Sequence, residues 1–300
     1  MAEGVSVGAL MCPVCGYPLR MNSKEAYCEN NHRFDRAKQG YLNLLRSQSS
    51  GMGHHGDDRL MLTGRRSFLE KGYYHTMRQK MAELASEFLP TDFMACSSGD
   101  LRKQSPGIAD DRNTVILDCG CGEGYYSEYL YSVLASSGKP VSMLCLDISK
   151  EAAKLTAKRN FPHETVVASA YELPVLSESC GMIVDNFAPV AEKEFLRVLA
   201  PGGILLRVVP EETHLWELKQ AVYDAPYEKS PVDPRLGGFE LLRCESVDYT
   251  IHLDCPQDIQ SLFKMTPYYY KTSRSDQAKL EGLNELTTRL SFAVLVSRKL

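Results

Sequence analysis

The sequence has no long apolar run, little excess charge and no pattern typical of export. Its longest apolar run, Ile204–Val209, is interrupted by Arg207 and falls far short of the ~18–20 residues that a membrane span needs. The first ten residues lack the basic start and the apolar stretch of a signal peptide. A net charge of −4 excludes a uniformly basic nucleic-acid coat but leaves local basic patches open. We therefore expect a cytoplasmic protein with no membrane partner.

The length and composition indicate a globular protein of more than one compact unit. The chain of 300 residues is 44% hydrophobic and 24% charged, which excludes a wholly disordered or fibrous protein. Three regions differ in composition. Residues 1–50 carry a cysteine cluster and many turn residues, residues 51–112 combine polar linkers with a helical segment, and residues 113–300 alternate between strand and helix patterns. The helical segment runs from Leu60 to Phe88 and is predicted to break near Gly72.

The third region predicts an α/β fold. Strands that alternate with crossover helices form a mostly parallel sheet covered on both faces. The predicted strands are Thr114–Asp118, Val141–Asp147, Thr165–Ala168, Met182–Phe187, Gly203–Val209, Glu245–Leu253 and Ser291–Arg298. The predicted helices are Tyr125–Ser136, Lys150–Asn160, Ala191–Leu199, Thr213–Tyr223 and Pro256–Met265.

Three cysteines and one histidine near the N-terminus have the spacing of a metal site. Cys12, Cys15, Cys28 and His32 form the pattern Cys-x2-Cys-x12-Cys-x3-His. Thiolate and imidazole ligands at this spacing close a tetrahedral zinc site, which leaves no position for a reactive water. We predict one structural zinc ion that stabilises a module too small for its own hydrophobic core. The alternatives are four unconnected residues or a single Cys-x2-Cys redox pair.

Basic and aromatic side chains are interleaved around these four residues. Such a mixture suits RNA backbones and unstacked bases, so the module is predicted to recognise RNA. A solvated surface is the alternative. The basic residues are Arg20, Lys24, Arg33, Arg36, Lys38 and Arg46, and the aromatic ones are Tyr17, Tyr27, Phe34 and Tyr41.

A glycine-rich loop follows the first predicted strand of the third region. Gly120, Gly122 and Gly124 let the backbone approach a ligand closely, and the next helix offers free N–H groups. Dinucleotide loops more often read GxGxxG, to cradle a pyrophosphate. Here Asp118 ends the strand before the loop and Asp147 ends the next strand. S-adenosylmethionine (SAM) has an ammonium group that suits Asp118, ribose hydroxyls that suit Asp147, and a carboxylate that suits a helix N-terminus. We predict a SAM site, with a purely structural turn as the alternative.

Specific motifs extend over nearly the whole chain, and together they resemble one family. In the N-terminal part they are Cys12-Pro-x-Cys15, Cys28-x3-His32-x-Phe34-Asp35, Ala37-Lys38-x-Gly40-Tyr41-x-Asn43-Leu44-Leu45, Gly56-Asp57, Arg65-Arg66-x-Phe68-Leu69 and Gly72-x-Tyr74. Further on they are Asp118-x-Gly-Cys-Gly-Glu-Gly-Tyr-Tyr126, Leu146-Asp-x-Ser149-Lys150, Ala188-Pro189, Arg197-Val198, Pro201-Gly-Gly203, His214-Leu215-x-Glu-Leu-Lys219 and Met265-Thr-Pro267. The chain resembles the RlmA family of 23S rRNA guanine-N1 methyltransferases.

The resemblance implies a class I SAM-dependent methyltransferase domain, Rossmann-like with a mostly parallel seven-stranded sheet, behind a small zinc-binding domain. It implies zinc ligands at Cys12, Cys15, Cys28 and His32. It implies cofactor contacts at Tyr74, Gly122, Glu123 and His214, with Asp147 as the ribose acceptor. The implied partner is a hairpin of 23S rRNA. Relatives pair as dimers around an RNA cleft, which makes a homodimer one alternative for the oligomeric state.

The sequence differs from many class I enzymes just after the third predicted strand of the third region. Many class I enzymes place an aspartate there for the adenine amino group, whereas this chain has Ala168-Ser169-Ala170, so main-chain groups or Ser169 would meet adenine. The general base is not identified from the sequence, and Asp185 is disfavoured for that role.

Phe187 could stack on a flipped guanine. The residues do not distinguish two nearby guanines, of which one is linked to macrolide resistance. The alternatives are a non-catalytic zinc-ribbon RNA-binding protein and a small-molecule SAM-dependent methyltransferase.

Overall fold

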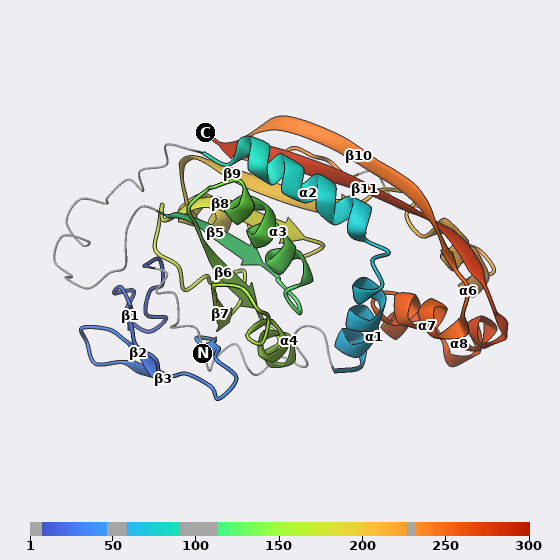
Figure 1. The fold of residues 1–300 in the computed structure, drawn as a ribbon, viewed down its shortest axis with the longest axis horizontal. Coiled ribbons are helices and arrows are strands. Elements are labelled where there is room, and N and C mark those ends of the chain that lie inside the picture. Colours follow the sequence, from blue (N-terminus) through green and yellow to red (C-terminus); the bar gives the residue numbers. More distant parts are fainter. Residues whose placement is uncertain (1–7, 47–58, 91–112, 227–231) are drawn as a thin grey trace.

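The centre of the protein is an eight-stranded sheet in the order β10-β11-β9-β8-β5-β6-β7-β4 (Figure 1). The structure is a computed structural model, and it describes residues 8–46, 59–90, 113–226 and 232–300. The strands of this sheet are β4 (Leu42–Asn43), β5 (Thr114–Cys119), β6 (Val141–Asp147), β7 (His163–Val167), β8 (Cys180–Asn186), β9 (Leu199–Pro210), β10 (Phe239–Leu253) and β11 (Leu286–Lys299). Every strand from β4 to β9 pairs in parallel with its neighbours, while β9–β11 and β11–β10 are antiparallel.

The predicted class I methyltransferase fold is confirmed. Strands β5 to β11 form the seven-stranded, mostly parallel sheet, and each of the seven predicted strands overlaps one of them. The eighth strand, β4, comes from the N-terminal region and extends the sheet beyond β7. This addition was not predicted, because a two-residue strand shows no periodicity in the sequence.

Two apolar layers cover the sheet. The helices α2 (His75–Phe88) and α3 (Tyr125–Ser136) pack on one face, where Leu130 and Val184 belong to the same buried cluster. On the other face, α5 (Glu192–Val198) and the N-terminal region pack over a second cluster that includes Ile183. The central strands are buried from both sides, which agrees with the mostly apolar sequence of β6, where Ser142 and the terminal Asp147 are the polar residues.

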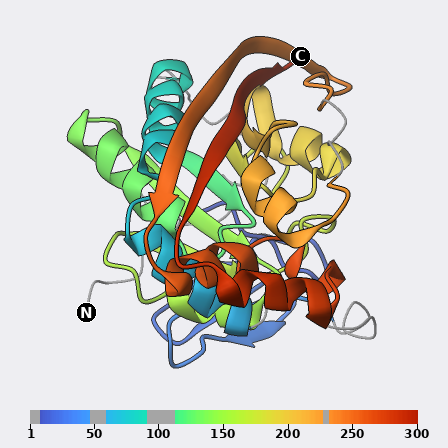
Figure 2. The ribbon, with the colours of Figure 1, turned by 90° about the vertical axis from the view of Figure 1, so that its right-hand side faces the viewer.

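The strands β10 and β11 form a long hairpin that curves over one end of the sheet (Figure 2). Helix α6 (Trp216–Val222) precedes β10. The connection between β10 and β11 forms α7 (Pro256–Lys264), η2 (Tyr269–Lys271), α8 (Arg274–Lys279) and η3 (Leu280–Gly282). Both strands are longer than predicted, since the outer part of β10 is largely exposed and polar and therefore carries no apolar signal. Among the described helices, none is long and apolar enough to span a membrane.

The predicted helical segment is confirmed as two helices, α1 (Arg59–Glu70) and α2. The break occurs at Gly72, whose φ of +83° lies in the left-handed region that favours glycine. Beyond this turn α2 packs along the sheet, whereas α1 lies against α7 at the end of the hairpin (Figure 1).

The N-terminal region is a small ribbon with a three-stranded sheet, β1 (Arg20–Met21), β2 (Glu25–Tyr27) and β3 (Arg33–Asp35). Strand pairing, an isolated bridge and ion pairs join it to the rest of the protein. Strand β4 pairs with β7, Leu10 bridges Val175, and Arg36 forms a two-bonded ion pair with Glu164 of β7. The ribbon is therefore built onto the edge of the methyltransferase sheet.

Candidate metal centre and cofactor site

The four predicted zinc ligands lie together in the ribbon. All their ligand atoms lie within 4.8 Å of one another. The Sγ atoms of Cys15 and Cys28 are 3.6 Å apart, and Nδ1 of His32 lies 3.5 Å from Sγ of Cys12 and 3.4 Å from Sγ of Cys28. A tetrahedron with metal–sulfur bonds of about 2.3 Å has sulfur–sulfur edges of about 3.8 Å, so these spacings fit one zinc ion.

Two of the residues predicted to face RNA are instead used inside the protein. Arg36 is largely buried in its ion pair with Glu164, and Tyr41 is 8% exposed. The prediction that they belong to an RNA-facing surface is therefore wrong, because the ribbon packs against the sheet through this face. Arg33 remains exposed, with its guanidinium carbon 5.7 Å from the centre of the Tyr27 ring.

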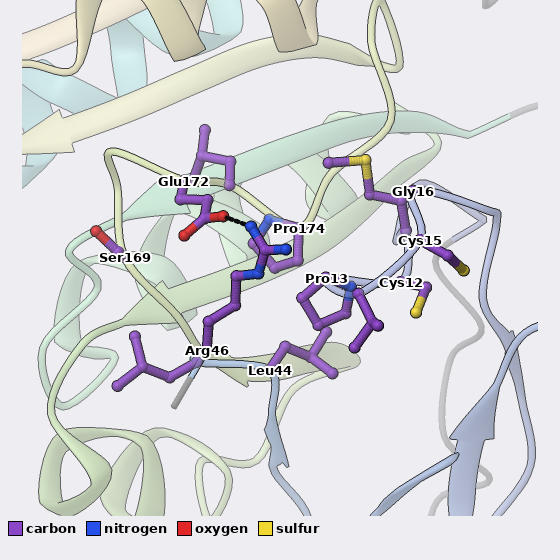
Figure 3. A pocket seen from close by; sticks show the side chains of 13 residues that line it. Cys12, Pro13, Cys15, Gly16, Leu44, Arg46, Ser169, Glu172 and Pro174 are labelled. Carbon is purple, nitrogen blue, oxygen red and sulfur yellow. Dashed lines mark hydrogen bonds and ion pairs between the residues drawn. The ribbon is translucent and has the colours of Figure 1, made fainter. Parts of the chain in front are cut away.

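A cavity of about 290 Å³ lies where the ribbon meets the loop after β7. Figure 3 shows Arg46 reaching across it to Glu172, with the turn that carries Cys12 and Cys15 on the opposite side. Ser169 lines the same cavity, and its hydroxyl accepts a hydrogen bond from the N–H of Tyr171 at 3.2 Å. Ser169, which was suggested to contact adenine, thus lies where the ribbon meets the sheet.

The glycine loop has the predicted open backbone. Gly120, Gly122 and Gly124 have φ values of +84°, +57° and +80°. A Cβ atom at Gly120 would stand 2.6 Å from Cβ of Ala188, which real side chains do not tolerate. The segment Phe187–Pro189, which follows β8, therefore packs through Ala188 on the loop that follows β5.

The two predicted acids lie on either side of this loop. Asp147 accepts the Gly122 N–H at Oδ2 (2.9 Å) and the Ser149 N–H at Oδ1 (2.8 Å), so the carboxylate is held at the end of β6. Asp118 is 1% exposed and accepts the hydroxyl of Ser127 at Oδ2. Burial raises the pKa of Asp118 to about 7, and the bond from Ser127 offsets part of that shift.

Glu123 is buried, and its carboxylate is engaged by the protein. It is paired with Arg159, whose Nε also donates to the Glu123 carbonyl at 3.0 Å. Arg159 reaches Glu128 of α3 and Glu70 of α1, both at 3.0 Å. Arg159 was not among the predicted site residues, because a single basic residue near the end of a predicted helix has no distinguishing pattern in the sequence.

Tyr74 and His214 are brought together around Phe292 of β11. Their ring centres lie 5.2 Å and 4.5 Å from that of Phe292 and 6.5 Å from each other. His214 accepts the N–H of Ser291 at Nδ1 (3.2 Å), which fixes its ring. Phe292 lies in a predicted strand, but this role was not predicted, since only the tertiary structure brings the three rings together.

Phe187 lies at the exposed border of the same aromatic group. Its ring centre is 5.7 Å from that of Phe292, and the side chain is 43% exposed. Its φ of +61° is a strained conformation for an aromatic residue, and such strain is typical of functional sites. Asp185, two residues earlier, is 2% exposed and lies 3.7 Å from Arg207. Burial raises the pKa of Asp185 to about 7, and the charge of Arg207 opposes that rise.

Comparison with known proteins agrees with this arrangement. Residues 10–50 match the family model described as RlmA, N-terminal, and residues 116–203 match a methyltransferase domain. A protein of Micromonospora griseorubida described as a 23S rRNA (guanine-N1)-methyltransferase is 33% identical over 70% of this chain and 68% of its own length. The chain belongs to the RlmA family of 23S rRNA (guanine-N1)-methyltransferases.

Two further relatives match almost end to end. The 23S rRNA (guanine(748)-N(1))-methyltransferase of Streptomyces fradiae is 29% identical over 95% of both chains. A Bacillus subtilis protein described as a 23S rRNA (guanine-N1)-methyltransferase is 26% identical over 100% of both. Both matches therefore extend over the residues that form the zinc ribbon and the methyltransferase domain of this chain.

The residues around the glycine loop fit SAM. The Oδ1 atom of Asp118 is buried and has no hydrogen-bond partner among the described residues, so it can accept from an ammonium group. The Asp147 carboxylate lies beside the glycine loop at the end of β6, and a carboxylate is a suitable acceptor for ribose hydroxyls. A fully closed Cys3His set fits a structural zinc ion and leaves no open position for chemistry.

Proposed function

We propose that this protein transfers the methyl group of SAM to N1 of a guanine in a hairpin of 23S rRNA. The observation that carries the proposal is the attachment of the zinc ribbon to β7, next to the strand that ends at Asp147. An RNA-binding ribbon and a cofactor site at adjacent strands suit one substrate that contacts both. We assign residues 1–50 to RNA recognition, 51–112 to the linker and helices, and 113–300 to methyl transfer.

Bound SAM supplies an already activated methyl group, so the main task of the protein is alignment. Asp118 would hold the ammonium group and Asp147 the ribose, while Gly122 and Glu123 present main-chain groups and Tyr74 and His214 line the pocket. The guanine would stack on Phe187, whose loop contacts Gly120 through Ala188. This contact links the position of the acceptor base to that of the methyl donor.

A small-molecule methyltransferase has no evident use for the exposed Arg33 beside the partly buried ring of Tyr27, whereas RNA binding uses both a cation and an aromatic ring. The family resemblance also supports a homodimer and a cytoplasmic location. Light scattering on the purified protein, with and without the hairpin, tests the oligomeric state.

Transfer of tritiated methyl groups tests the proposed activity. The protein is incubated with labelled SAM and either unmodified 23S rRNA, an isolated hairpin or a metabolite extract. We expect label in the rRNA, recovered as 1-methylguanosine after digestion. Label confined to the metabolites would favour a small-molecule enzyme, and RNA binding without any transfer would favour a binding protein.

A further inference from the structure

Ion pairs hold helix α1 next to the glycine loop. Arg159 joins Glu123 of the loop to Glu70 at the end of α1, with 3.0 Å between Arg159 and Glu70. Arg66 of α1 also lies 4.0 Å from Glu123. These contacts place α1, which follows the ribbon and linker in the chain, directly beside the cofactor site.

Close packing fixes the rotation of α1 about its axis. A Cβ atom at Gly64 would lie 3.2 Å from Cβ of Lys264 and 3.3 Å from the carbonyl oxygen of Ser261, so α1 and α7 touch closely there. Phe68 stacks on Tyr73 with 4.7 Å between ring centres and meets Tyr74 edge-on at 5.4 Å. With these residues buried, the direction in which Arg65 leaves the helix is determined.

The side chain of Arg65 reaches the glycine loop. Its Nη1 atom lies 3.4 Å from the position that a Cβ of Gly122 would take. Burial raises the pKa of the Tyr74 and Tyr126 hydroxyls, and the charge of Arg65 opposes that shift at both residues. The guanidinium therefore lies among the loop and two tyrosines that border the cofactor site.

Only one group of SAM has the charge that the Arg65 guanidinium would bind. Asp118 and Asp147 account for the ammonium group and the ribose, and the only anionic group of SAM is its carboxylate. A guanidinium binds a carboxylate through two parallel hydrogen bonds, which favours arginine at such a position. We propose that Arg65 binds the methionine carboxylate of SAM, an inference that rests on the proposed function. Ligand binding would then hold α1 on the loop as well.

Direct binding measurements test this role without methyl transfer. Calorimetry compares S-adenosylhomocysteine with its decarboxylated analogue, which keeps the amine and lacks the carboxylate, on the full chain. We expect Arg65→Gln to weaken binding of S-adenosylhomocysteine about ten- to hundredfold and to leave the analogue within about threefold. Arg65→Lys keeps the charge but loses the two-bonded geometry, so its affinity should be intermediate. Arg59→Gln, at the exposed start of the same helix, is the matched control.

The two ligands distinguish the outcomes. If Arg65→Gln misfolds, it loses the affinity for both ligands. In that case Arg65→Lys tests the inference, because it should weaken the binding of S-adenosylhomocysteine more than that of the analogue. If Arg65→Gln keeps the wild-type ratio of the two affinities, the inference is wrong, and weaker hairpin binding in that variant would assign Arg65 to RNA phosphate. If the wild-type protein binds neither ligand, the proposed function itself fails.

Discussion

Arg36 of the zinc ribbon and Glu164 of β7 form a two-bonded ion pair between residues that are 128 positions apart. The two N–O distances are 2.6 Å and 3.0 Å, and a third bond joins Arg36 to the carbonyl of Gly40 at 2.7 Å. The Glu164 side chain is 2% exposed and that of Arg36 15%. Burial raises the pKa of Glu164 and the Arg36 charge opposes that rise, so the pair couples the ribbon to the sheet.

Loss of this pair should destabilise the protein. Arg36→Ala leaves a buried carboxylate without its partner, and we expect the free energy of unfolding to fall by about 3 kcal/mol. Urea denaturation followed by circular dichroism measures the change. Arg20→Ala, which removes the exposed pair with Glu29, should cost less than about 1 kcal/mol. Equal effects of the two substitutions would show that the buried pair does not hold the joint.

Zinc content should depend on the cysteines of the ribbon. We expect one zinc ion per wild-type chain and a content near zero in Cys15→Ser, because a hydroxyl cannot replace a thiolate ligand. Elemental analysis of the purified protein measures this. Cys244→Ser, at an exposed position on β10, should keep the full metal content. Stoichiometric zinc in Cys15→Ser would refute the ligand assignment.

Cofactor affinity should depend on Asp147. Asp147→Ala removes a charged acceptor of two ribose hydroxyls, and charge-assisted hydrogen bonds contribute roughly 1.5–3 kcal/mol. Calorimetry should therefore show that the affinity for S-adenosylhomocysteine falls about ten- to a hundredfold. Asp233→Ala, at an exposed residue, serves as the control. An unchanged dissociation constant would exclude Asp147 from the site.

The same affinity should depend on pH through Asp118. Its pKa is about 7 in the free protein, and binding of an ammonium group favours the ionised carboxylate. Affinity should therefore rise with pH up to about 7 and fall roughly tenfold per unit below it, with release of a proton on binding. Asp118→Asn should bind more weakly and lose this pH dependence. A wild-type affinity that stays constant between pH 5.5 and 7 would contradict the role.

Methyl transfer should depend on the ring of Phe187 while cofactor binding should not. Phe187→Gly relieves the positive φ but removes the stacking surface, which is worth roughly 1–3 kcal/mol per base. We expect methylation of the hairpin to fall about ten- to a hundredfold at unchanged affinity for S-adenosylhomocysteine. Tyr171→Ala, at another exposed aromatic residue, is the control. Full activity of Phe187→Gly would remove Phe187 from the base site.

The sequence by itself determined the zinc ligands, the glycine loop with Asp118 and Asp147, and the order of strands and helices. Each of these depends on spacing or periodicity within a short stretch of chain, where local geometry follows from the residues themselves. The bounds of β6 and α3 agree with their predicted ranges for this reason.

Only the tertiary structure decided which polar and aromatic side chains meet. Arg36 belongs to an interior ion pair, Arg159 joins the loop to α1, and Phe292 gathers Tyr74 and His214. These contacts join distant parts of the chain, so no local sequence pattern predicts them. A basic residue on a surface and one in a buried pair look alike in the sequence, since burial is a property of the assembled layers.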